Sequence, residues 1–215
     1  MNQRLLIVKG MGNVTAKPDM VIIRMDLTNQ QRDYTQTMEA AGKNIESMRQ
    51  ALISLGYKRD TLKTTDFKIS TEYENIRHSN GDYTRQFMGY KCTHELKLEI
   101  DFDMKRLGEA LAAVSSCGAN PALRINFSVK DKTTVSAALL ESAISNAKDK
   151  AAILARSAGV TLGAIQRIDY NWGELRLYSS TRPHFDNSME MSCAIDIEPD
   201  DIDVDDTVTV VWAIE

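Results

Sequence analysis

The sequence predicts an α+β fold, with a mixed, largely antiparallel sheet and about three amphipathic helices on one face. Residues 133–158 place apolar side chains on one arc of a helical wheel. Several other segments alternate apolar and polar residues, as strands with one buried face do. The elements do not follow the strict strand–helix alternation of a parallel sheet, so we expect one α+β domain over residues 1–215.

Two strands and a helix open the chain. Leu5–Val14 has strand character, and Val21–Leu27 alternates apolar with polar residues. Asp33 begins a capping-box pattern, and apolar residues then recur at three-to-four spacing until Gly56. This segment is therefore expected to be an amphipathic helix of about 22 residues.

A long hairpin and a second helix come next. Phe67–Tyr73 and Tyr90–Ile100 both alternate, and the polar stretch His78–Asp82 between them contains an Asn-Gly turn signal. Asp103 is placed to cap the following helix, which should end at Gly118.

The longest predicted helix, Thr133–Ala158, follows a strand at Leu123–Val129. Asp131 or Thr133 can cap its start, and Gly159 suits the left-handed position after its end. Small residues four apart should let its backbone lie close against a sheet. These residues are Ala143, Ala147 and Ala151.

The C-terminal part combines a strand at Ile168–Trp172, an irregular loop at about 173–192 and a final strand at Val208–Ile214. The final strand has apolar residues on both faces, so we expect it to be covered on both sides, or to lie where another subunit can cover it, with Trp212 at that interface. A neighbouring subunit could also pair the free edges of the long hairpin. The protein is therefore expected to form a homo-oligomer, unless the loop covers these surfaces.

Composition excludes several classes of partner and site. The net charge is −4, and the sequence has no basic face with interleaved aromatic residues. We therefore do not expect it to bind nucleic acid or an anionic membrane surface. No apolar run approaches the roughly 20 residues of a transmembrane helix. As written, Met1–Arg4 leads directly into the strand-like Leu5–Val8 without the longer apolar region of a leader. We therefore expect a cytoplasmic protein, or a periplasmic or secreted one if a signal peptide has been removed. An odd number of distant cysteines, Cys92, Cys117 and Cys193, favours reduced thiols.

Two features could carry chemistry, although each has a simpler structural interpretation. His94 lies on the apolar side of its strand, where it could be a ligand or a base. A hydrogen-bonded histidine in the core or at the sheet edge is the simpler interpretation. The acidic segment at 196–206 lacks the Gly and Glu positions of an EF-hand loop and is interpreted as a solvated strand edge. Its acidic residues are Asp196, Glu198, Asp200, Asp201, Asp203, Asp205 and Asp206. We therefore assign no catalytic, cofactor-binding or metal-binding residues.

Several short stretches, in their order and spacing, resemble the SIMPL-domain family. They are Val8–Val14, Pro18-Asp19, Gly89-Tyr90, Gly118–Asn120, Phe127–Asp131 and Ala158–Gly163. The family includes bacterial periplasmic and oxidative-stress proteins and a eukaryotic kinase-associated signalling protein. The resemblance implies an α+β fold without recognised catalytic residues and, in some members, large ring-like or channel-like oligomers. The 173–192 loop has no counterpart in it.

The sequence thus predicts a non-enzymatic binding or assembly protein of the SIMPL type, linked to stress response or envelope function. The alternative is an enzyme or metal-binding protein that uses His94 or the acidic 196–206 segment. Gly10 and Gly12 are expected to permit a close strand approach and not a cofactor site.

Overall fold

The computed structural model describes residues 4–77, 81, 83–171, 173, 175–181, 183 and 197–215. Over these residues the chain forms seven strands, three α-helices and one short 3-10 turn, η1 (Arg59–Thr61). The predicted α+β class with antiparallel strands is confirmed. The elements belong to two compact units, formed by residues 1–19, 128–180 and 199–215 and by residues 20–127 and 181–198.

Each unit has its own sheet, whereas the sequence predicted one sheet with all three helices on one face. The difference arises at residues 17–19, where the chain leaves the first strand of one sheet and begins the first strand of the other. The helices are divided accordingly, with one on the first sheet and two on the second. That residues 1–215 fold as one domain stays a prediction.

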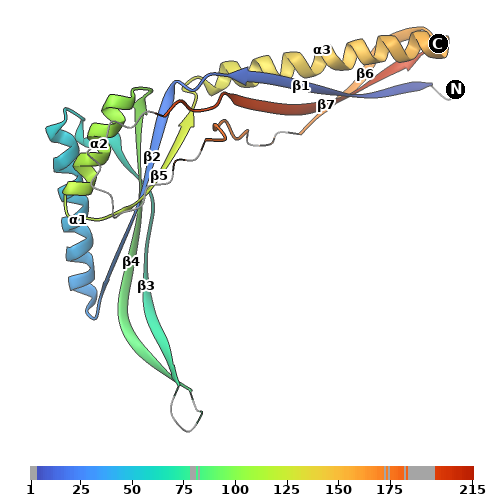
Figure 1. Ribbon diagram of the computed structural model, residues 1–215. Helices are drawn as coiled ribbons and strands as arrows, with labels where there is room; N and C mark the ends of the chain where they lie inside the picture. Colours follow the sequence, from blue (N-terminus) through green and yellow to red (C-terminus); the bar gives the residue numbers. More distant parts are fainter. Residues whose placement is uncertain are drawn as a thin grey trace. The chain divides into compact units, whose positions relative to one another are not determined.

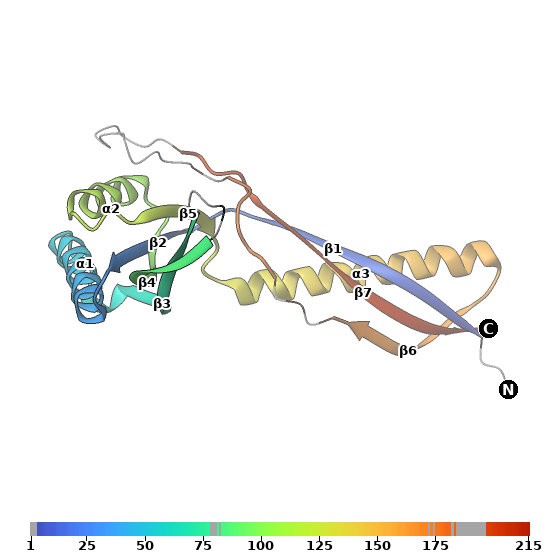
Figure 2. The same ribbon diagram turned by 90° about the horizontal axis from the view of Figure 1, so that it is seen from below.

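The first unit has a three-stranded antiparallel sheet. Its strands are β1 (Leu5–Ala16), β7 (Ile202–Ile214) and β6 (Leu162–Tyr170), in the order β1-β7-β6. The long helix α3 (Lys132–Ala158) runs along β1 and β7, as Figures 1 and 2 both show. The final strand of the chain is thus the central strand of this sheet.

Glycines in β1 allow α3 to approach the sheet very closely. A Cβ atom on Gly10 would lie 2.1 Å from the carbonyl oxygen of Ala143, and one on Gly12 would lie 2.2 Å from that of Leu139. The facing Ala147 side chain is fully buried. The predicted close approach of the alanines of α3 to a sheet is therefore confirmed, and the element that approaches Gly10 and Gly12 is this helix and not another strand.

Polar side chains of α3 also occupy the free edge of β1. The backbone N–H of Met11 donates to Oδ1 of Asn146 at 3.0 Å, and that of Asn13 donates to Oγ of Ser142 at 3.3 Å. Since β7 pairs with the opposite edge of β1, α3 satisfies backbone groups that a foreign strand could otherwise bind.

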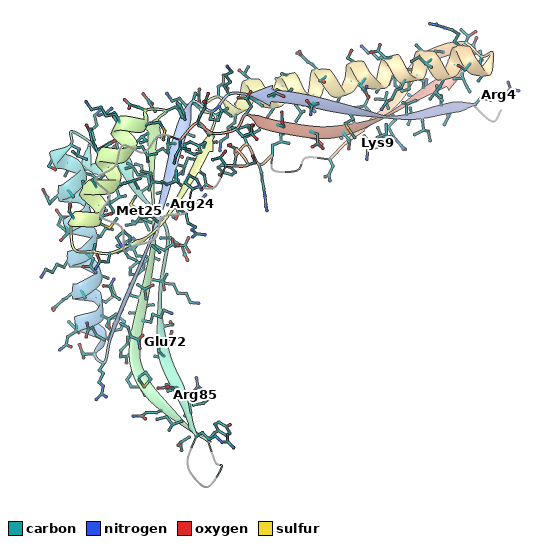
Figure 3. The ribbon with its side chains drawn as sticks, in the orientation of Figure 1. Arg4, Lys9, Arg24, Met25, Glu72 and Arg85 are labelled. Carbon is teal, nitrogen blue, oxygen red and sulfur yellow. The ribbon has the colours of Figure 1, made fainter. Side chains whose placement is uncertain are left out.

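The second unit has a four-stranded sheet in the order β3-β4-β2-β5. Its strands are β2 (Met20–Gln31), β3 (Leu62–Arg77), β4 (Tyr83–Asp101) and β5 (Ala122–Ser128). Helices α1 (Tyr34–Ser54) and α2 (Met104–Ser116) lie on one face of this sheet (Figure 2). Adjacent residues of β2 show the two environments: Met25 is fully buried in the core and Arg24 is partly exposed (Figure 3).

Aspartate side chains cap all three helices, as predicted for Asp33, Asp103 and Asp131. Each carboxylate accepts a hydrogen bond from a backbone N–H in the first helical turn. The hydroxyl of Thr134, and after it the backbone N–H of the same residue, donate to the Asp131 carboxylate and hold its pKa below the usual value. At the other end of α3, Gly159 has φ of 68°, the predicted left-handed conformation.

Trp212 of the final strand, which was predicted to lie at a subunit interface, is covered by its own chain. Trp212 is 3% exposed and packs beneath α3. Residues 175–180 form no helix or strand, but Leu177 is buried against Ile202 and Val204 at the start of β7. Part of the predicted irregular loop therefore packs on this strand, and most of its remainder lies outside the described residues.

Candidate binding surface on the β3–β4 hairpin

The hairpin of β3 and β4 extends beyond the rest of its sheet. β2 ends at Gln31, which pairs with Tyr90, so residues 83–89 of β4 pair only with β3. Figure 1 shows this two-stranded part continuing past α1, and Figure 3 labels Glu72 and Arg85 on it. The predicted hairpin is confirmed; of its predicted turn, 78–80 and 82 lie outside the described residues.

A glycine marks the point where the two-stranded part begins. Gly89 has φ of 127°, and a Cβ atom there would lie 2.2 Å from the carbonyl oxygen of Gln31. A register shift between Glu72 and Tyr73 occurs at the same level. Only glycine fits such a backbone beside the end of β2, so this residue allows the hairpin to continue past it.

Three aromatic rings of the hairpin and one from the start of α1 form a continuous group, which we call the aromatic row: Tyr73, Phe87, Tyr90 and Tyr34. The ring centroids are 5.6 Å apart for Tyr73 and Phe87, 5.4 Å for Phe87 and Tyr90, and 5.5 Å for Tyr90 and Tyr34. Each pair has edge-to-face geometry. Tyr34, Tyr73 and Phe87 are 49%, 44% and 43% exposed. The aromatic row is thus an ordered but open apolar surface.

Two arginine side chains lie over aromatic rings of the hairpin, and one of these rings belongs to the aromatic row. The guanidinium carbon of Arg85 lies 4.0 Å from the centre of the Tyr73 ring, and that of Arg77 lies 6.0 Å from the centre of the Tyr83 ring. Tyr, Phe and Arg are among the side chains enriched at protein–protein interfaces, and Tyr and Arg are among those that often contribute most of the binding energy. The composition of this surface therefore suits contact with another protein chain.

His94 lies on β4, near the base of the hairpin and among buried residues. Its side chain is 8% exposed, its Nε2 atom lies 2.9 Å from Oγ1 of Thr64, and the Phe67 ring packs edge-on against it at 5.1 Å. Burial lowers the pKa of His94 below its ordinary 6.5, and the nearby positive charge of Arg49 lowers it further. The interpretation of His94 as a hydrogen-bonded core histidine is confirmed.

The acidic segment does not bring its carboxylates together in the described part of the chain. Asp203 accepts a hydrogen bond from the Thr15 hydroxyl at 2.6 Å, and Asp206 accepts one from the Tyr170 hydroxyl at 2.9 Å. Asp196 lies outside the described residues. Among those described, no group of three or more His, Cys, Asp and Glu side chains could hold a metal ion.

The cysteine thiols are free where the structure describes them. Cys92 is fully buried, and burial raises the pKa of its thiol. Cys117 is partly buried and donates to the carbonyl oxygen of Val114 at 3.0 Å. Cys193, His78 and His184 lie outside the described residues.

Sequence reasoning identified the hairpin but missed the aromatic row. Phe87 and Tyr90 are three residues apart, which strict strand alternation would place on opposite faces. The register shift at Glu72 and Tyr73 brings their rings together, and Tyr34 joins them from the start of a helix. The density of aromatic residues between 67 and 90 was the available signal.

None of the helices in the described residues is both long enough and apolar enough to cross a membrane.

Comparisons with known proteins place the chain in a family. Residues 6–212 match the family described as SIMPL, a protein of unknown function (DUF541). The 26 kDa periplasmic immunogenic protein of Brucella melitensis biotype 1 is 26% identical over 161 residues, which cover 75% of this chain and 64% of the relative. The protein of the same name from Brucella abortus strain S19 matches to the same extent. The chain thus spans under two thirds of the length of these relatives. Because the family match covers nearly the whole of this chain, the chain belongs to the SIMPL family.

Proposed function

We propose that this chain is a non-enzymatic protein that binds protein chains and self-associates through the β3–β4 hairpin. The exposed aromatic row is the observation that carries this proposal. A soluble surface seldom leaves several ordered aromatic side chains together in the open unless another molecule covers them.

The proposed absence of catalysis rests on the state of the candidate side chains. His94 is enclosed by Phe67 and Thr64, and the thiol of Cys92 is buried with a raised pKa. Neither has an adjacent carboxylate or base within the described hydrogen-bond network that would activate it. The alternative of an enzyme or metal protein gains no specific support from these positions.

The periplasm is the compartment that we propose. Two similar proteins are named as periplasmic, and their compartment agrees with the second of the two locations considered from sequence. A role in stress response rests only on the family resemblance and stays a prediction. Fractionation of the native cell, with the protein detected by antibody, tests the location.

Light scattering coupled to size exclusion tests self-association and its dependence on the hairpin. The wild-type protein should elute with a mass that is a multiple of 24.1 kDa and rises with concentration. Phe87→Asp places a charge in the aromatic row, at the two-stranded end of the hairpin where the core is not disturbed, and should shift the protein to smaller species.

Ile153→Asp provides the matched control, because Ile153 is 59% exposed on α3, outside the hairpin. It should leave the mass unchanged, and circular dichroism should show both variants folded. A wild-type mass of one chain at every concentration overturns the proposal of self-association. An equal effect of the two substitutions overturns the assignment to the hairpin.

A further inference from the structure

We propose that β3 pairs antiparallel with β3 of a second copy of this chain, about a two-fold axis at Thr71. The inference rests on the proposed function, because it names the partner and register for the same hairpin. It would join two four-stranded sheets into one.

β3 is a long and uncovered edge strand. It has 16 residues, compared with about five to six in a typical strand, and it is at the end of its sheet. After the irregularity between Thr64 and Asp66, residues 66–77 run without a bulge of their own. None of the described residues forms a backbone hydrogen bond to its outer edge. Such an edge binds another strand through its unpaired N–H and C=O groups.

The other sheet edges are less suited to a partner. Side chains of α3, including Asn146 and Ser142, occupy the free edge of β1. β6 has register shifts on both sides of Ile165, and β5 is only seven residues long. Among the described strands, β3 therefore combines length, regularity and an uncovered edge.

The helices leave room for this pairing. α1 packs on β2 and β4, and the residues of β3 on the same face remain open beside it, including Phe67, which is 45% exposed. A two-fold axis perpendicular to the sheet keeps equivalent faces of both copies on one side. In such a pair, the numbers of any two opposite residues have the same sum. This sum must be even, because an odd sum would place a residue of one face opposite a residue of the other face.

Charge selects one of these registers. With Thr71 opposite Thr71, Lys68 lies opposite Glu74 of the second copy, twice by symmetry, and no like charges face each other. The neighbouring registers centred on residues 69, 70, 72 and 73 each oppose two carboxylates. These pairs are Asp66 with Glu72, Asp66 with Glu74, Glu72 with Glu72, and Glu72 with Glu74.

Both charges of the selected pair are available to a second copy. Within the chain, Lys68 lies opposite Thr93 and Glu74 opposite Gln86, and neither forms a salt bridge with any described residue. The same register places Ile69 opposite Tyr73 on the helix-bearing face, an apolar cross-strand pair. Residues 66–76 of two copies would exchange about ten backbone hydrogen bonds.

A charge exchange on β3 tests the register. Lys68→Glu or Glu74→Lys alone makes two like-charge pairs across the axis and should raise the dimer dissociation constant roughly tenfold or more. The double variant restores two opposite-charge pairs and should return the constant close to the wild-type value. Lys43→Glu, an exposed position on α1, makes the same change in net charge as Lys68→Glu and should have little effect. Sedimentation equilibrium at low salt measures these constants.

The possible results show whether the register alone fails or self-association fails with it. Weakening by both single variants with recovery in the double variant supports the Thr71 register. Additive weakening in the double variant, or no effect of either single variant on a protein that does assemble, overturns the register while self-association stands. A wild-type protein that remains a single chain overturns both.

Discussion

At the scale of single residues, the roles of Gly10, Gly12 and His94 follow from what packs against each of them. Gly10 and Gly12 are required by the helix that lies within van der Waals contact of their backbone. The sequence indicated a close approach there, because two glycines in a strand leave no side chain to keep a neighbour away. It could not show that the neighbour was α3, more than a hundred residues later in the chain.

Gly10→Ala should reduce the free energy of unfolding by about 1–3 kcal/mol, because the new methyl group would collide with the backbone of Ala143. Gly42→Ala is the control, since a methyl group there meets nothing within 4 Å and lies in the interior of α1. That change should raise stability by about 0.5–1 kcal/mol. Urea unfolding followed by circular dichroism compares them, and effects of the same sign would contradict the packing described for β1.

His94 should make stability depend on pH. Its pKa is below 6.5 in the folded protein, so the unfolded chain binds this proton more readily. The stabilisation is fully present above pH 6.5 and is lost as the pH falls toward the folded pKa. Melting temperatures of the wild type and His94→Gln, compared from neutral pH to about pH 5, should therefore converge on acidification. Parallel curves would show that His94 is not the group responsible.

At the scale of elements, helices and strands followed closely from sequence, whereas their grouping did not. The aspartate caps, Gly159 and the alternation in the hairpin act over a few residues, and each was confirmed. Division into two sheets depends on which distant strands pair, and alternation carries no information on this. Trp212 illustrates the limit: its burial was predicted, but the covering element is α3 and not another subunit.

The phase of α3 can be tested at two adjacent residues. Ala147→Arg would force a charged side chain against Gly10 and should cost about 3 kcal/mol or more. Lys148→Ala lies on the exposed side and should change stability by no more than about 0.5 kcal/mol. Thermal unfolding measures both, and equal decreases in melting temperature would mean that the helix is rotated from the arrangement described.

At the scale of the whole molecule, the chain treats its sheet edges differently. Side chains of α3 close the edge of β1, whereas the edge of β3 and the aromatic row beside it remain open. The sequence predicted that the hairpin would have unpaired edges, because its strands are longer than the predicted helices of the chain could cover. The aromatic row depends on a register shift that alternation does not reveal. Both open features are on one hairpin, which is why we infer that a second copy covers it.

Amide hydrogen exchange at low and high protein concentration tests this inference most directly. If β3 pairs with its counterpart, alternate amides within residues 66–76 should exchange more slowly in the concentrated sample, where the dimer is populated. Amides on the free edge of β6 should exchange at the same rate in both samples. Equally fast exchange along β3 at both concentrations, in a protein whose mass has doubled, would contradict the account and place the interface elsewhere.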